Sequence, residues 1–132
     1  SIAFPEEHPM GIDIESMSKI KPKAIASQCT KNEIKRLQSV VQDEILTYAL
    51  LWTTKESISK CIRTGLMVDF KQLEISTIDK FDEGYYVFHF RKFLQYKTYI
   101  IPKKDYCLAI SLPKKSQLNI LHLIEELDKN RL

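Results

Sequence analysis

The sequence predicts a single α+β domain, with helices packed on one antiparallel β-sheet. The chain of 132 residues has the size of one modest domain. The spacing of its apolar residues changes near the middle of the chain, from a period of about 3.6 to a period of about 2. Four segments rich in β-branched and aromatic residues then follow one another with short turns between them, which favours antiparallel hairpins over β-α-β crossovers.

The first expected element is a strand over residues 10–15, which contains the stretch Gly-Ile-Asp-Ile-Glu. Ile12 and Ile14 alternate with Asp13 and Glu15, so the pattern predicts one apolar face and one acidic face. Because residues two apart in a strand share a face, the two carboxylates should project in the same direction.

The next part of the chain, up to Gly65, is expected to form two or three helices, with a long helical pattern that runs on from Thr30. Pro22 lies in a basic connection and can start a helical turn. Thr30 and Glu33 have the spacing of a capping box, in which each side chain bonds the backbone N–H of the other residue. The apolar residues that follow recur at near-helical spacing; they are Ile34, Leu37, Val41, Ile45, Tyr48, Leu51 and Trp52. Gly65 is typical of the residue that ends a helix.

The second half is expected to contain four strands and a last helix. The predicted strands are residues 70–77, 84–93, 95–102 and 106–112, with turn sequences such as Asp-Glu-Gly and Pro-Lys-Lys-Asp between them. The last helix is expected over residues 116–130. Its apolar stripe would consist of Leu118, Leu121, Ile124 and Leu127.

Composition narrows the function classes. With a net charge of +3 the chain lacks the dense Lys/Arg stripe of a dedicated nucleic-acid binder, so no nucleic acid is expected as a partner. No apolar run approaches the roughly 18 residues that a membrane helix needs, so no membrane is expected either. The three cysteines are an odd number without Cys-x-x-Cys spacing, which points away from a disulfide framework or a zinc site and towards a reducing cytoplasm.

Asp13 and Glu15 raise the question of what compensates two adjacent like charges. Burying both carboxylates would cost several kcal/mol unless a cation lay beside them. A hard ion such as Mg2+ prefers carboxylate, water and phosphate oxygens. By itself, however, Asp-x-Glu is more typical of two solvated acids on an exposed strand face.

Glu56 and Lys60 form a second motif. They are four residues apart in the expected long helix, hence on one helical face. Alone, this spacing is typical of an ordinary surface pair, and the nearby Trp52 is typical of a packing residue.

Three segments of the chain, in this order and with this spacing, together resemble the motifs of the 4'-phosphopantetheinyl transferase superfamily. They are Gly-Ile-Asp-Ile-Glu, the helical Cys-x-x-x-Glu region at 29–33, and Trp-x-x-Lys-Glu-Ser-x-x-Lys, whose Trp52 follows Glu15 by 37 residues. The resemblance covers about residues 9–112 and is closer to the long, surfactin-synthetase type. It implies a half-domain in which strand, helices and antiparallel sheet follow in this order.

The resemblance also implies roles for four residues. Asp13 and Glu15 match the acids that ligate Mg2+ in this family, and Glu56 matches a third ligand that is also proposed as the base for the incoming serine. Lys60 matches a lysine that contacts the phosphates of coenzyme A. Such enzymes transfer the 4'-phosphopantetheine arm of coenzyme A to a serine of an acyl or peptidyl carrier protein, releasing 3',5'-ADP, in fatty acid, polyketide or nonribosomal peptide biosynthesis.

Long-type enzymes consist of two similar halves with the active site between them, so residues 1–132 are expected to form one domain that corresponds to the C-terminal half. The short, trimeric holo-acyl-carrier-protein synthases match the length, but their late strand carries a Ser-His pair, and Tyr-Cys-Leu-Ala-Ile-Ser-Leu here has no histidine. We therefore expect a missing N-terminal half or a homodimer partner to complete the site, and little transfer by a monomer.

Two other classes stay open at this point. A metal-dependent nuclease also uses Asp-x-Glu with a distant glutamate, although two-metal nucleases need a further acid and a basic groove. A non-catalytic interaction domain would leave the acids solvated and use its apolar surface for a partner protein.

Overall fold

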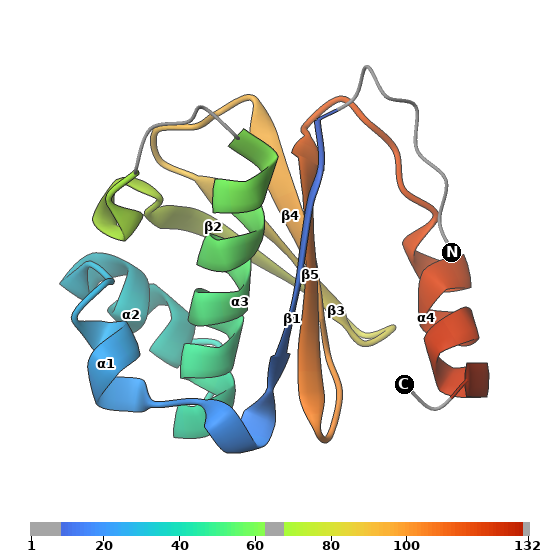
Figure 1. Ribbon diagram of the computed structural model, residues 1–132, viewed down its shortest axis with the longest axis horizontal. Helices are drawn as coiled ribbons and strands as arrows, with labels where there is room; N and C mark the ends of the chain where they lie inside the picture. Colours follow the sequence, from blue (N-terminus) through green and yellow to red (C-terminus); the bar gives the residue numbers. More distant parts are fainter. Residues whose placement is uncertain (1–8, 63–67, 131–132) are drawn as a thin grey trace.

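The computed structural model describes residues 9–62 and 68–130, which fold into three layers (Figure 1). The β-sheet is the central layer, three helices cover one of its faces, and the last helix lies over the other. In chain order the elements are β1 (Gly11–Ser16), η1 (Met17–Lys19), α1 (Pro22–Ala26), α2 (Lys31–Gln38), α3 (Glu44–Ile62), η2 (Phe70–Gln72), β2 (Ile75–Phe81), β3 (Tyr85–Phe90), β4 (Tyr96–Pro102), β5 (Tyr106–Pro113) and α4 (Ile120–Asn130). This arrangement confirms the predicted fold class.

The sheet has the strand order β1-β5-β4-β3-β2, and each neighbouring pair is antiparallel. The expected turns between β2 and β3 and between β4 and β5 are present, and Gly84 in the first of them has a φ of 101°. Only glycine adopts such an angle readily. β1 pairs with β5, so the first strand of the described chain forms one edge of the sheet.

Two apolar clusters lie on opposite faces of the sheet. The inner cluster joins the sheet to α1, α2 and α3. α3 is the central helix, with contacts to β1, β4, β5, α1 and α2, which explains why buried residues occur on most of its sides. The outer cluster joins β4 and β5 to α4; its buried members are Ile101, Leu108, Ile110, Leu112, Ile120, Leu123 and Leu127.

The predicted capping box is confirmed, and the helices expected before the sheet are present as α1, α2 and α3, but the helical pattern does not run unbroken after Thr30. Thr30 Oγ1 accepts from Glu33 N at 3.2 Å, and Glu33 Oε2 accepts from Thr30 N at 2.8 Å. α2 nevertheless ends at Gln38, and a new helix follows Asp43, whose carboxylate accepts from the N–H of Leu46. Val41 in the connection is buried, so it continues the apolar spacing without being helical. The predicted helix end at Gly65 lies outside the described residues.

The strand predicted over residues 70–77 begins later than expected. Residues 70–72 form the 3-10 turn η2, and β2 covers Ile75–Phe81. The carbonyls of Phe70 and Leu73 accept hydrogen bonds from Lys55 Nζ, which holds this segment away from the sheet ladder.

The last helix is present but starts at Ile120 rather than at residue 116. The carboxamide oxygen of Asn119 accepts from the N–H of His122 and caps it. The buried stripe contains Ile120, Leu123 and Leu127. Leu121, which we predicted on the buried stripe, is 52% exposed. The face of α4 that packs on the sheet is rotated by about one residue from the predicted face.

Among the described residues, no helix combines the length and the apolar character needed to span a membrane.

Candidate functional site

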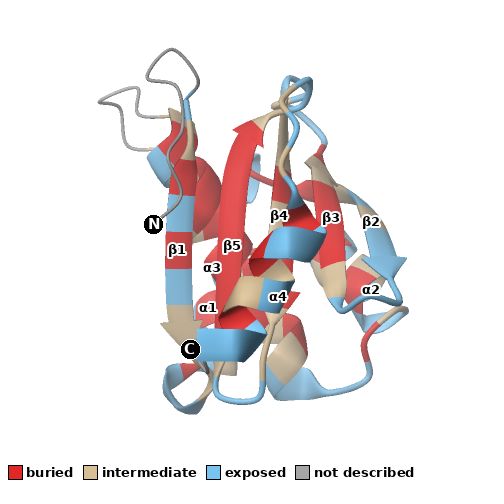
Figure 2. Ribbon diagram, turned by 90° about the vertical axis from the view of Figure 1, so that its right-hand side faces the viewer, coloured by how far each residue is buried: buried red, intermediate tan, exposed pale blue. Residues whose placement is uncertain are grey.

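The acidic face of β1 points into the molecule. Asp13 is 6% exposed, whereas Ile12 and Ile14 are 40% and 61% exposed. Figure 2 shows this alternation as buried and exposed bands along β1. The interpretation of two solvated acids, which is typical of Asp-x-Glu alone, is therefore wrong for Asp13, and the isoleucines occupy the outer face of the strand.

α3 lies directly against the start of β1 because Gly11 has no side chain. A Cβ at Gly11 would lie 2.1 Å from the carbonyl oxygen of Ser57 and 2.5 Å from the backbone nitrogen of Cys61. Both are backbone atoms of α3, so no side-chain movement could relieve the clash. The glycine of the Gly-Ile-Asp-Ile-Glu motif thus permits the contact between strand and helix.

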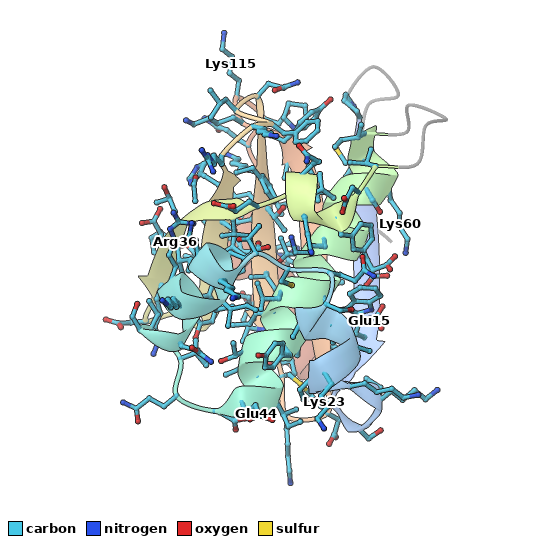
Figure 3. All side chains as sticks on the ribbon, turned by 90° about the vertical axis from the view of Figure 1, so that its left-hand side faces the viewer. Glu15, Lys23, Arg36, Glu44, Lys60 and Lys115 are labelled. Carbon is cyan, nitrogen blue, oxygen red and sulfur yellow. The ribbon has the colours of Figure 1, made fainter. Side chains whose placement is uncertain are left out.

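Lys60 reaches from α3 to β1. Its Nζ donates to Asp13 Oδ1 at 2.7 Å and to the Ile12 carbonyl at 3.3 Å. Its side chain is 49% exposed, so the ammonium lies at the boundary between Asp13 and solvent. Figure 3 shows Lys60 and Glu15 on the same edge of the molecule.

The pKa shifts at this edge show that the four predicted site residues share one electrostatic environment. Burial raises the pKa of Glu15 to about 7, supported by a hydrogen bond with Asp13 and by the charges of Asp13 and Glu56, against the opposing charge of Lys60. Burial and the charge of Asp13 also raise the pKa of Glu56. The hydrogen bond to Asp13, together with the three nearby carboxylates, raises the pKa of Lys60.

The donor chemistry fits a hard divalent ion, although the described residues contain no group of three His, Cys, Asp or Glu side chains already close enough to hold one. Asp13 Oδ2 is buried and has no hydrogen-bond partner among them. Two ionised carboxylates cannot bond each other, so this oxygen gains a donor only if Glu15 is protonated. A cation between the acids would remove the same deficit, with the side chains closing around it.

Two open pockets adjoin residues of the candidate site, one at Lys60 and one at Glu15. One of about 460 Å³ is lined by Met10, Gly11, Ile12 and Lys60. Another of about 410 Å³ is lined by Glu15, Lys19, Ile20, Lys21, Ala24, Ile25, Gln28 and Trp52. The second combines a carboxylate, two ammonium groups and an indole ring, so it offers both charged and apolar surface to a ligand.

Lys55, the residue before Glu56, is completely buried and has a structural role rather than a place in the candidate site. Its Nζ lies 2.9 Å from Glu33 Oε2, and both side chains are 0% exposed. Glu33 also accepts from the N–H of Thr30 and Ile75. This network joins α2, α3 and β2 and fixes the helix from which Glu56 and Lys60 project.

The comparisons with known proteins agree with this geometry. A family model described as the 4'-phosphopantetheinyl transferase superfamily matches residues 9–111. The chain belongs to this superfamily. It is also similar to "4'-phosphopantetheinyl transferase gsp" from Aneurinibacillus migulanus, with 40% identity over 62 residues. That stretch is 46% of this chain and 26% of the relative, so the similarity spans about a quarter of the relative's length.

Sequence reasoning proposed Asp13, Glu15, Glu56 and Lys60 as site residues but did not name the residue that ties their two elements together. Ser57 donates to the Gly11 carbonyl from inside the motif. A serine in a helix that packs against a strand glycine indicates a hydrogen bond of this kind. The sequence gives this indication only when the strand and the helix are already known to be in contact.

Proposed function

We propose that this chain provides the metal- and phosphate-binding part of a 4'-phosphopantetheinyl transferase. The enzyme would transfer the 4'-phosphopantetheine arm of coenzyme A to a serine of an acyl or peptidyl carrier protein. Its cofactor would be Mg2+, and the released product would be 3',5'-ADP. The ion pair between Lys60 and the buried Asp13 at the contact of β1 and α3, with Glu15 and Glu56 near enough to interact electrostatically with both, carries this proposal. Membership of the superfamily supplies the reaction class.

Asp13, Glu15 and Glu56 would hold the Mg2+ ion. When bound, such an ion neutralises the charge that develops on the diphosphate oxygens during transfer. Lys60 is half-exposed, so its ammonium can turn from Asp13 towards a phosphate oxygen. Two positively charged groups of the neighbouring pocket, Lys19 and Lys21, would add to the attraction for an anionic substrate.

Glu56 is our candidate for the general base. The serine hydroxyl of the carrier protein must lose a proton as its oxygen attacks phosphorus, while the bond from phosphorus to the 3',5'-ADP oxygen breaks. Burial and the charge of Asp13 raise the pKa of Glu56 in the metal-free chain. Because a Mg2+ ion on its carboxylate would lower this basicity, Glu56 would accept the serine proton through an intervening water molecule.

A second structural unit would complete the site, either an N-terminal half or another copy of this chain. The described residues offer few cations for the several phosphate charges of coenzyme A, and the aligned relative is much longer than the matched stretch. We place the enzyme in the cytoplasm, a reducing compartment that fits an odd number of cysteines without Cys-x-x-Cys spacing.

The proposal is tested by incubating the chain with apo carrier protein, coenzyme A and Mg2+, and following the carrier by mass spectrometry. We expect one phosphopantetheine to be added per carrier, with activity concentrated in a dimeric fraction or in a sample supplied with the other half. Asp13→Ala and Glu56→Ala should abolish the transfer.

The matched control is Asp79→Asn, which removes an exposed carboxylate from β2 at the opposite edge of the sheet. It should leave the rate unchanged. Absence of transfer in every oligomeric state and with a supplied half, or transfer that EDTA does not reduce, would contradict the proposal.

A further inference from the structure

We propose that Ser57 is a positioning residue, whose buried hydroxyl ties the start of β1 to α3 and thereby sets the place of Asp13 relative to Glu56 and Lys60. The consequence for metal binding rests on the proposed function; the tie between strand and helix does not.

Three buried hydroxyl groups form one chain that ends on β1. Ser57 Oγ lies 2.9 Å from the Gly11 carbonyl oxygen and 2.8 Å from Ser111 Oγ. Ser111 Oγ lies 2.6 Å from Thr98 Oγ1. Ser57, Ser111 and Thr98 are each 0% exposed, so water does not compete for these bonds.

Ser57 is the donor in both of its bonds, and its single proton can point to the Gly11 carbonyl or to Ser111 Oγ. The Gly11 carbonyl can only accept, so Ser57 is the hydroxyl of this group that ties α3 to β1. In the bond between Thr98 and Ser111 either hydroxyl can donate. The chain therefore links β4, β5 and α3 to the first residue of β1.

β1 needs this link because it is an edge strand. β5 pairs with it on one side, and α3 lies against its inner face. Lys60 also reaches β1, but in the proposed reaction its ammonium turns towards a phosphate. The Ser57 bond is buried and unaffected by that movement, so it can keep β1 in place while Lys60 moves.

The position of Ser57 in α3 makes the link specific for the site. Ser57 follows Glu56 directly and precedes Lys60 by three residues, so one helical turn carries all three side chains. The bond from Ser57 to Gly11 fixes the rotation of this turn about the helix axis. Asp13 lies two residues beyond Gly11 on the same face of β1.

The test compares Ser57→Ala with Thr98→Val in the purified chain. Ser57→Ala removes the donor to Gly11, whereas Thr98→Val removes a buried hydroxyl from the far end of the same network and leaves the Ser57–Gly11 bond. Two quantities are measured in each variant: hydrogen exchange of the β1 amides relative to those of β4, and affinity for Mn2+, used as a probe for the Mg2+ site.

We expect the β1 amides to exchange about tenfold faster in Ser57→Ala, with the β4 amides unchanged. Affinity for Mn2+ should fall about tenfold, in the range seen when a residue that orients metal ligands is lost. Thr98→Val should stay within about twofold of the wild type in both quantities. If Ser57→Ala does not fold, Ser57→Cys retains a weaker donor and should give smaller changes in the same direction.

Unchanged β1 exchange in Ser57→Ala, or equal changes in Ser57→Ala and Thr98→Val, would overturn the positioning role. A wild-type chain that binds no Mn2+ would instead contradict the proposed metal site. The exchange of the β1 amides would then decide the role of Ser57 alone.

Discussion

Glu15 lies in surroundings that favour its neutral form. In the metal-free chain, burial, the hydrogen bond with Asp13, and the charges of Asp13 and Glu56 raise its pKa from 4.5 to about 7. The folded chain therefore keeps a proton that the unfolded chain releases at lower pH. Between about pH 4.5 and pH 7 the folded state binds more protons than the unfolded state, so this group makes the free energy of unfolding fall as the pH rises.

We expect Glu15→Gln to abolish this dependence. Below about pH 4.5 the variant and wild type should have similar stability, and above about pH 7 the variant should be more stable by a constant amount. The pKa change sets an upper limit of about 3 kcal/mol, which solvent screening of the partly exposed carboxyl reduces to about 1 kcal/mol. Urea unfolding in EDTA from pH 4 to pH 8 measures the difference.

The control for Glu15→Gln is Glu125→Gln, which neutralises an exposed carboxylate on α4. Its free energy of unfolding should follow the wild-type curve at every pH. A Glu15→Gln variant that also follows the wild-type curve would show that burial and the neighbouring carboxylates do not raise the pKa of Glu15 in the folded chain.

At the level of the elements, the buried Lys55–Glu33 pair holds α3 in place. We expect Lys55→Met to lower the free energy of unfolding by about 3–5 kcal/mol, because it leaves the carboxylate of Glu33 buried without its cation. The double variant Lys55→Met/Glu33→Gln should recover part of this loss, since it removes the uncompensated charge. Chemical unfolding of the single and double variants measures both values.

A suitable control is Lys129→Met, because the Lys129 side chain is 65% exposed and pairs with Glu125 in solvent. It should cost less than about 1 kcal/mol. If Lys55→Met is equally mild, water must reach Glu33 in the variant, and the pair would not be the anchor of α3.

The elements that the sequence predicts well are those whose signal is local. The Thr30–Glu33 box and the Asp-Glu-Gly turn depend on neighbouring residues alone, and both are present. The break between α2 and α3 was missed because Val41 lies in the connecting segment and is nevertheless buried. Only tertiary packing buries an apolar residue at such a place. The delayed start of β2 has a similar cause, since Lys55 from another element binds the carbonyls of the segment.

The same distinction between local sequence signals and tertiary packing applies to the candidate site. The four charged residues were proposed from two motifs and from the family resemblance that these motifs carry together, and their role in a site stays a prediction. The orientation of β1 could not be predicted, because an alternating Ile-Asp-Ile-Glu strand does not say which face meets α3. Gly11 decides it, through a close contact between strand and helix that has no signature in local sequence.

For the whole molecule, the sheet separates the candidate site from a second apolar layer. The site lies where β1 meets α3 on the inner face, whereas α4 covers β4 and β5 on the outer face (Figure 1). The matched family region ends at residue 111, before α4. The two layers should therefore respond independently to change.

We expect a chain truncated after Lys115 to keep the inner layer and expose the outer one. Without α4, the side chains of Ile101, Leu108, Ile110 and Leu112 would face solvent, an apolar patch of the kind that promotes association. Fluorescence of the dye ANS and the oligomeric state should both increase relative to the full chain. Protection of the β1 amides should stay the same, because Ser57, Lys60 and β5 still hold the strand. A truncated chain that remains monomeric without binding ANS would contradict the role of α4 in covering the outer face of the sheet. Loss of β1 protection would show that the two layers are coupled through the sheet.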